Sequence, residues 1–427
     1  MEDHLSRAAR LAILAIVGQG LVYLLSVILA RQLGIDGFES YAVASAAFTL
    51  MVVVSPRGIE KYALRLIPSL YEREDWGAAK GFLKYSLQRT LGTTLVVGSL
   101  VFVFVQYFSP FPASTKQAII VSCLSLPSGA LVHYGIEVLS ANGRDITATA
   151  LFRVAVPSVT LLIVLVIVLL PVQISGAMAV GCWGISWTIV FVILATQIKK
   201  TTPFQLWSCK SIEDLSTWKK EALPFQNYRI TLALLAQIGV IFIDRLHPSA
   251  AAVGGYVAAA STVNLALVLA TATNRFYSRR LSILLEQRDF AGILKLRKER
   301  LQWLLPCMLL FLLIIFVFGR QILGFFRPEF VTEGIAALQI LAITTTIVGL
   351  FSLGPTYLKY MGHNRAIFTT MLGAVVCQII MLVVLVPRFA ATGGAIAYAL
   401  SMGGMYLMFA RMAHNKLVQI QKPSEKP

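Results

Sequence analysis

The stretch LARQLGIDGFESYAVASAAF, residues 29 to 48, is the part of the sequence that decides the fold. One apolar run ends at Leu33 and Gly34, two glycines and two acids form a turn, and a second apolar run begins at Tyr41. Half a chain later, FIDRLHPSAAAVGGYVAAASTVNLAL, residues 242 to 267, has the same arrangement, with Tyr256 in the place of Tyr41. This similarity predicts that one helical unit occurs twice in the chain.

The composition is that of an integral membrane protein. Of the 427 residues, 57% are apolar and only 13% are charged, and the mean hydropathy is +0.75. Soluble domains have about 45–50% apolar and about 25% charged residues. The five cysteines are scattered and form no Cys/His cluster. We therefore expect neither a metal site nor a disulfide framework, and we expect no cofactor.

The apolar runs predict about twelve transmembrane helices. A helical span needs about 20 apolar residues, and the runs lack the polar/apolar alternation of barrel strands. Most of the 37 Lys and Arg residues fall in one set of loops, which places both termini in the cytosol. The formal charge of +17 is thereby explained by topology, and no nucleic-acid partner is expected. The predicted spans are 11–31, 38–57, 89–108, 117–138, 147–170, 174–197, 223–244, 250–274, 301–319, 333–355, 366–387 and 391–411.

One longer cytosolic segment, residues 274 to 302, mixes Leu and Ile with Arg and Lys in a helical rhythm. This pattern is typical of a helix that lies in the membrane interface. It would either recognise an anionic headgroup or anchor the chain against anionic lipid in general, and general anchoring is favoured.

Two more pairs of segments support the duplication. LSANGRDITATALFRVAV (139–156) is similar to YMGHNRAIFTTMLGAVV (360–376), and LLPVQISGAMAVG (169–181) is similar to LVPRFAATGGAIAYA (385–399). All three pairs occur in the same order in both halves. Six spans in each half make a parallel repeat, which predicts two lobes with a cleft that opens alternately to either side. The predicted parts are an amino-terminal lobe 1–200, a cytosolic linker 201–222, a carboxyl-terminal lobe 223–415 and a cytosolic tail 416–427.

The same stretches resemble a known family, the polysaccharide transporters that include the Wzx-type O-unit flippases. This family belongs to the multidrug/oligosaccharidyl-lipid/polysaccharide (MOP) superfamily. The resemblance extends from about residue 11 to 415. It departs from the family at Ser40 and at Arg327-Pro328-Glu329, where glycines are usual. The similar segments are Leu33-Gly34 with Tyr41, FIDRL…VGGY (242–256), FGRQILGFFRPEFVTEGIAALQILAI (318–343), GHNR (362–365) and LVPRFAATGGAIAYALS (385–401).

The resemblance implies a twelve-helix fold of two lobes, similar to the multidrug-extrusion (MATE) transporters. It implies a flippase that moves an undecaprenyl-diphosphate-linked oligosaccharide, an O-antigen or exopolysaccharide repeat unit, from the cytosolic to the outer leaflet of the bacterial inner membrane. The implied partners are this lipid-linked substrate, membrane lipids and a polysaccharide polymerase. The protein would be a transporter in lipopolysaccharide or polysaccharide biosynthesis and would not be an enzyme.

Basic side chains within or beside the spans are candidates to bind the diphosphate. Charges inside a membrane are costly and are functional candidates by default, and Arg binds phosphate oxygens bidentately. The spacing of Arg57, Lys61 and Arg65 predicts a shared helical face. For these three and Arg89, snorkelling to headgroups remains an equal alternative, whereas the deeper Arg153 and Arg229 favour the cleft. The six candidates are Arg57, Lys61, Arg65, Arg89, Arg153 and Arg229.

Two acids are candidates for coupling transport to an ion. Glu137 has His133 one turn before it, which suggests proton coupling, a hydrogen-bonded interior pair or a residue at the membrane interface, and the last two are favoured. Asp244 would bind a coupling cation, or it would form an ion pair with Arg245 or act at the helix end, and the structural roles are favoured. Glu60 lies beside the predicted basic face and would neutralise part of it.

Three alternative functions remain to be weighed. A multidrug exporter of cations would need acids in its cleft, whereas Arg and Lys predominate here. The lipid II flippases of the same superfamily typically have fourteen spans, whereas twelve are predicted here. A membrane polymerase or ligase would need a catalytic constellation or a large outer loop, and the sequence shows neither.

Overall fold

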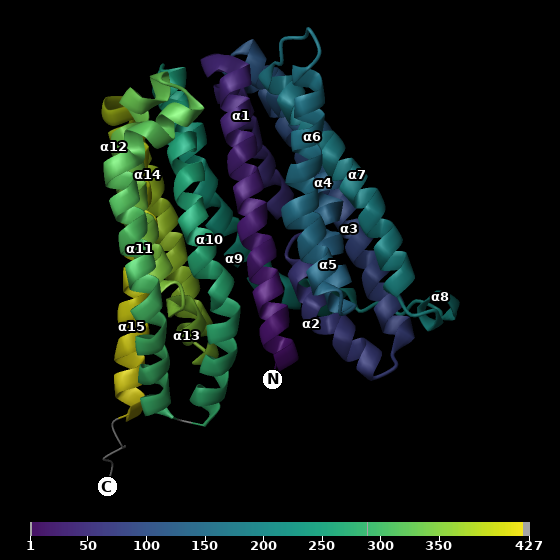
Figure 1. Cartoon of the computed structure of the whole chain (residues 1–427). Helices are drawn as coiled ribbons and strands as arrows, with labels where there is room; N and C mark the ends of the chain where they lie inside the picture. Colours follow the sequence, from purple (N-terminus) through teal and green to yellow (C-terminus); the bar gives the residue numbers. More distant parts are fainter. Residues whose placement is uncertain (1, 288, 422–427) are drawn as a thin grey trace. The chain divides into compact units, whose positions relative to one another are not determined.

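A computed structural model describes residues 2–287 and 289–421, and this part of the chain consists of helices and turns, without a β-strand (Figure 1). Its contacts divide the chain into two compact units. One unit is Ile28–Ile241, and the other combines Met1–Val27 with Phe242–Pro427. We call them the amino-terminal unit and the carboxyl-terminal unit.

All twelve predicted spans lie on helices. In the described part of the chain, nine helical segments are long and apolar enough to cross a membrane. Two of these contain two predicted spans each and are interrupted by one non-helical residue, Gly34 (φ 74°) in α1 (Glu2–Val54) and Ala390 (φ 47°) in α14 (Asn364–Tyr398). The seventh predicted span lies on α9 (Leu215–Leu246). The chain is thus an all-α integral membrane protein, and the turn expected after Leu33 is reduced to Gly34.

The amino-terminal unit is built around the packing of α4 against α7. Gly184 of α7 makes this close packing possible, because a Cβ atom there would lie 2.0 Å from the Oγ atom of Ser125 in α4. The second half of α1 and most of α9 complete the unit. Its other helices are α2 (Ile59–Glu72), α3 (Trp76–Val103), η1 (Phe104–Phe108), α4 (Ala113–Ala141), α5 (Asp145–Ala150), η2 (Leu151–Ala155), α6 (Val156–Val168), α7 (Gly176–Thr201) and α8 (Gln205–Ser208).

The carboxyl-terminal unit is built around the packing of α10 against α12. Gly255 and Gly334 bring the two backbones together, because a Cβ atom at Gly255 would lie 3.0 Å from the Gly334 nitrogen. The first half of α1 belongs to this unit, where the rings of Tyr23 and Phe326 lie 5.3 Å apart. Its other helices are α10 (Ala250–Glu286), α11 (Phe290–Phe326), α12 (Glu329–Phe351), α13 (Gly354–Tyr360), α14, η3 (Ala399–Gly403) and α15 (Gly404–Gln421).

The internal duplication is visible in the backbone of two turns. Gly143 (φ 81°) follows α4, and Gly362 (φ 78°) follows α13. In both turns the glycine N–H donates to the carbonyl three residues earlier, and the next N–H donates to the carbonyl five residues earlier. These hydrogen bonds all measure between 2.9 and 3.1 Å. The two similar segments 139–156 and 360–376 therefore share the same turn, although the first continues into the π-helical turn η2 and the second into the α-helix α14.

Each of the two similar segments that contain Tyr41 and Tyr256 also lies beside a glycine of its own unit. A Cβ atom at Gly176, the first residue of α7, would lie 3.1 Å from the nitrogen of Tyr41. A Cβ atom at Gly394 in the carboxyl-terminal unit would lie 3.4 Å from the ring of Tyr256. In each unit, the glycine of one repeated segment thus packs beside the tyrosine of another.

The structure differs from two sequence expectations. The compact units have other boundaries than the predicted lobes, since residues 1–27 group with the carboxyl-terminal unit and residues 201–241 with the amino-terminal unit. No separate interfacial helix spans 274–302, because α10 continues to Glu286 and α11 begins at Phe290, after Asp289 caps it by accepting from the Gly292 N–H at 2.8 Å. Residues 422–427 of the predicted tail lie outside the described residues.

Candidate functional site

The turn between α1 and α2 places the first candidate residues against α9. Gly58 has a left-handed backbone (φ 76°), and a Cβ atom there would lie 2.5 Å from both the Ala222 carbonyl oxygen and the Gln226 nitrogen. Only a residue without a side chain fits this approach. Helix α2 therefore starts at Ile59 with its first turn directly beside α9.

This turn corrects the prediction for the basic face. Arg57 lies in the turn (φ 54°) and not on α2, so only Lys61 and Arg65 share a helix. Arg65 lies near Tyr62, where burial and the nearby Glu221 raise the tyrosine pKa while Arg65 opposes the shift. Because Gly58 interrupts the helix, the expected row of three cations is not formed.

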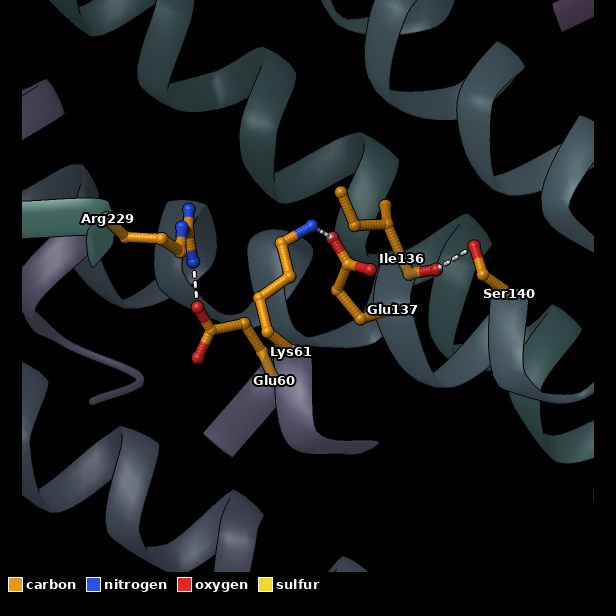
Figure 2. Close-up of polar contacts among 6 residues, drawn as sticks. All are labelled: Glu60, Lys61, Ile136, Glu137, Ser140 and Arg229. Atoms are coloured by element: carbon orange, nitrogen blue, oxygen red, sulfur yellow. Dashed lines mark hydrogen bonds and ion pairs between the residues drawn. The ribbon is translucent and has the colours of Figure 1, made fainter. Parts of the chain in front are cut away.

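Two ion pairs join α2 to its neighbours, and each uses a residue of its first turn (Figure 2). Glu60 accepts a hydrogen bond from the Nη1 atom of Arg229 on α9. Lys61 donates from Nζ to the Oε1 atom of Glu137 on α4. Glu60 is fully buried, and its Oε2 atom has no hydrogen-bond partner among the described residues. The structure therefore brings two predicted cations together and pairs each with a carboxylate.

His133 connects these pairs to Arg153. Its ring lies one turn before Glu137 and stacks on Trp187 at a centroid distance of 5.6 Å. Both Lys61 and Arg153 interact electrostatically with His133. Within the described part of the chain, Glu137 therefore has Lys61 as its partner instead of the expected His133.

Arg153 reaches this region from η2, a π-helical turn that links α5 to α6. Its guanidinium carbon lies 5.6 Å from the centre of the Phe152 ring, and Phe152 in turn contacts the ring of His133 at 5.0 Å. Single π-helical turns often occur at functional sites because the extra residue redirects side chains. We use the name polar cluster for Glu60, Lys61, His133, Glu137, Arg153 and Arg229.

The polar cluster lies near the polar end of the helices. On α7 the exposed residues change from Ile189 and Val192 to Lys199 and Lys200 within about two turns. Gly135, on α4 between His133 and Glu137, packs against Leu194 and Ile198 of α7. The cluster is therefore at the level where the apolar surface gives way to basic residues.

The remaining candidates lie outside the polar cluster. Arg89 lies well inside α3, which begins at Trp76 instead of near residue 89, and its Nη1 atom donates to the Tyr85 hydroxyl at 2.7 Å. The spacing of four residues could have identified Tyr85 as its partner. Asp244 is part of the carboxyl-terminal unit and accepts from the Nε atom of Arg245 at 2.8 Å. The two coupling candidates, Glu137 and Asp244, thus belong to different units.

The charges of the polar cluster suit an anion that can displace a carboxylate. Three cationic and two anionic side chains come from α2, α4, η2 and α9. Lys61 is 38% exposed and therefore accessible, whereas the Arg229 side chain is 18% exposed. The arrangement combines cationic groups, of the kind that bind phosphate oxygens in proteins, with internal carboxylate partners.

Comparison with known proteins identifies the fold. No family model matches the chain, and no curated protein sequence matches it. Among solved structures, the inward-facing conformation of a multidrug resistance MATE family transporter of the MOP superfamily is similar, with a TM-score of 0.72 and 11% identity, covering 97% of this chain and 99% of that one. The outward-facing conformation of a multidrug resistance MATE family transporter of the MOP superfamily has a TM-score of 0.65 and 13% identity, with 97% of this chain and 96% of that chain covered.

A third similar structure is a MOP superfamily transporter from Pyrococcus furiosus, described as having a binding pocket of reverse polarity that suggests a different function. Its TM-score is 0.66 at 12% identity, with 97% of this chain and 96% of that chain covered. Over nearly its whole length, the chain thus has the fold of MOP superfamily transporters. At this level of identity the likeness concerns the fold and does not single out the Wzx-type flippases within it.

Proposed function

We propose that this chain is a MOP-type transporter whose cargo is a lipid-linked oligosaccharide and whose polar cluster binds the cargo's diphosphate. The observation that carries the proposal is the convergence of Lys61, Arg153 and Arg229 from three separate elements within one unit. Arg and Lys are the side chains best suited to phosphate oxygens. The reverse polarity described for the binding pocket of the Pyrococcus furiosus transporter supports a departure from multidrug transport in this fold.

The carboxylates have a defined part in this proposal. Glu60 and Glu137 hold Arg229 and Lys61 while the cargo is absent, because a buried cation without a partner would be costly. A diphosphate that enters the polar cluster replaces the carboxylates as the partner of the cations. The ion pairs with Glu60 and Glu137 form again when the cargo leaves. This exchange requires exposure to either side of the membrane, and both an inward-facing and an outward-facing conformation are described among multidrug resistance MATE family transporters of this fold.

The basic residues at the helix ends also indicate how the chain is oriented in the membrane. Basic residues surround the helix ends nearest the polar cluster, as at Lys199 and Lys200, and such residues are enriched on the cytosolic side. We therefore place both termini and the polar cluster on the cytosolic side of the bacterial inner membrane. A polysaccharide polymerase would receive the cargo on the other side.

Binding of a short isoprenyl diphosphate to the purified protein tests the proposal. We expect Arg153→Ala and Lys61→Ala each to weaken binding of farnesyl diphosphate about tenfold or more, because each removes a charge-assisted hydrogen bond. Arg144→Ala is the matched control, since Arg144 is exposed in the turn before α5 and lies outside the polar cluster. Isothermal titration in detergent measures the affinities. Equal binding by all three variants and the wild type would exclude the polar cluster as the diphosphate site.

A second candidate function is export of small organic cations. Multidrug transporters are among the similar structures, and Glu60 offers a buried oxygen, Oε2, that has no partner in the described part of the chain. For this function, Glu60→Gln should abolish binding of an organic cation such as ethidium. The same titration distinguishes the candidates, because a diphosphate site would not bind ethidium.

A further inference from the structure

The carboxyl-terminal unit contains a cavity far from the polar cluster in sequence. It lies between the first turns of α11, the end of α12, α13 and the last turns of α15, and its volume is about 150 Å³. Most of its lining is Leu, Ile, Phe and Ala, and its polar side chains are Arg297, Arg300, Tyr357 and His414. An apolar cavity of about this size holds a benzene molecule, so a phosphate-sized group fits. Among the described residues, no carboxylate lines it.

Arg300 is the buried polar side chain of this cavity. It is only 3% exposed, and it donates to the carbonyl oxygens of Leu350 at 2.9 Å and Gly349 at 3.0 Å, which belong to the last turn of α12. It also donates to the Oγ atom of Ser352 at 2.7 Å. Its Nε atom has no hydrogen-bond partner among the described residues. A buried donor without a partner at the wall of a cavity favours an acceptor from a ligand.

The cavity lies at the border between apolar and basic surface. The exposed residues of α11 change from Lys295, Arg297 and Lys298 to Leu305 and Leu309 within about three turns. On α15 the order is reversed, from the exposed Leu407 and Met408 to Arg411 and His414. Both helices therefore pass from the hydrocarbon region to the headgroup region at the level of the cavity.

From these observations we infer that the cavity binds the phosphate of an anionic phospholipid. Arg297 is exposed, and no carboxylate pairs with it within the described residues, so it meets the phosphate at the surface. Arg300 contributes its buried Nε donor from α11, and His414 lines the cavity from α15. The acyl chains remain along the exposed Leu305 and Leu309. Basic pockets between transmembrane helices at the cytosolic surface bind anionic headgroups in this way.

This inference does not depend on the proposed transport function. The cavity belongs to the carboxyl-terminal unit, whereas the polar cluster belongs to the amino-terminal unit. The bound lipid would fasten the start of α11 to α13 and α15, so its effect is expected on stability and not on cargo choice.

Native mass spectrometry and thermal melting of the delipidated full-length protein test the inference. With phosphatidylglycerol added, we expect one retained lipid and a raised Tm, and phosphatidylcholine should give neither. Arg297→Ala should weaken phosphatidylglycerol binding about tenfold or more, and Arg297→Lys should retain part of it. Because Arg297 is exposed, the lipid-free Tm of these variants should match that of the wild type.

Lys298→Ala is the matched control, since Lys298 is the exposed neighbour of Arg297 and does not line the cavity. It should bind phosphatidylglycerol as the wild type does. An equal loss in Lys298→Ala and Arg297→Ala would mean general attraction to a basic surface and would overturn the inference. Inorganic phosphate that raises the Tm as much as the lipid would overturn it as well, because the site would then be one for free phosphate.

Discussion

At the scale of single residues, the ion pair between Glu60 and Arg229 is the feature that the sequence could suggest but not specify. Hydropathy singles out Arg229 as a charge within a span, and Glu60 as an acid beside a basic segment. The two residues are 169 positions apart, so no local spacing rule connects them. The pairs of Arg89 with Tyr85 and of Asp244 with Arg245 are local, and their spacing makes them predictable.

We expect Glu60→Gln to destabilise the protein by about 3–5 kcal/mol, because it leaves the largely buried Arg229 without its carboxylate partner. The double variant Glu60→Gln with Arg229→Gln should recover part of this loss, since no unpaired charge remains. Glu72→Gln is the control on the same helix, where the side chain is exposed. Chemical denaturation in detergent measures the three variants. A Glu60→Gln protein as stable as Glu72→Gln would show that the pair contributes nothing to the fold.

At the scale of elements, hydropathy predicted the spans well and their ends poorly. The apolar runs fall on helices throughout, but α3, α10 and α11 extend beyond their predicted spans into polar sequence. Polar residues can continue a helix after it leaves the membrane, so hydropathy does not mark where it ends. Helix α2 was missed as a separate element because only the short turn 55–58 divides it from α1, and its left-handed residues Arg57 and Gly58 leave no mark in the hydropathy.

The segment 210–212, which precedes α9, packs closely on α3 because α3 has a glycine at the contact. The backbone of Ile212 lies against α3, where its N–H donates to the Gly77 carbonyl at 3.0 Å. A Cβ atom at Gly81 would lie 1.9 Å from the Ile212 carbonyl oxygen. The clash would be with backbone, which cannot move without releasing the connection.

Gly81→Ala should therefore detach residues 210–212 from α3, so that the backbone beside the exposed Lys210 can enter the active site of trypsin. Gly92→Ala on the same helix is the control, because a Cβ atom there meets no atom within 4 Å. Limited proteolysis of the purified proteins should cut after Lys210 several times faster in Gly81→Ala than in Gly92→Ala. Equal cleavage rates would contradict the tight docking of the connection.

For the molecule as a whole, the sequence predicted an all-α membrane protein with an internal duplication, and the structure confirms this prediction. The repeated glycines explain why this was predictable: Gly143 and Gly362 need the same left-handed turn, so both copies kept them. The grouping of α1 and α9 was not predictable, because each begins in one unit and ends in the other. The charges of the polar cluster were named from sequence, but their neutralisation by Glu60 and Glu137 depends on tertiary contacts.

We propose that the polar cluster binds the diphosphate of a lipid-linked glycan and that the protein transports this glycolipid. Transport by the purified protein in liposomes tests both parts together. The measurement compares movement of a fluorescent undecaprenyl-diphosphate oligosaccharide with movement of ethidium, for the wild type, Arg153→Ala and the control Arg144→Ala. We predict that the wild type and Arg144→Ala move the glycolipid between leaflets, that Arg153→Ala loses most of this activity, and that ethidium is not transported. Transport of ethidium without movement of the glycolipid would contradict the account and would identify an exporter of organic cations instead.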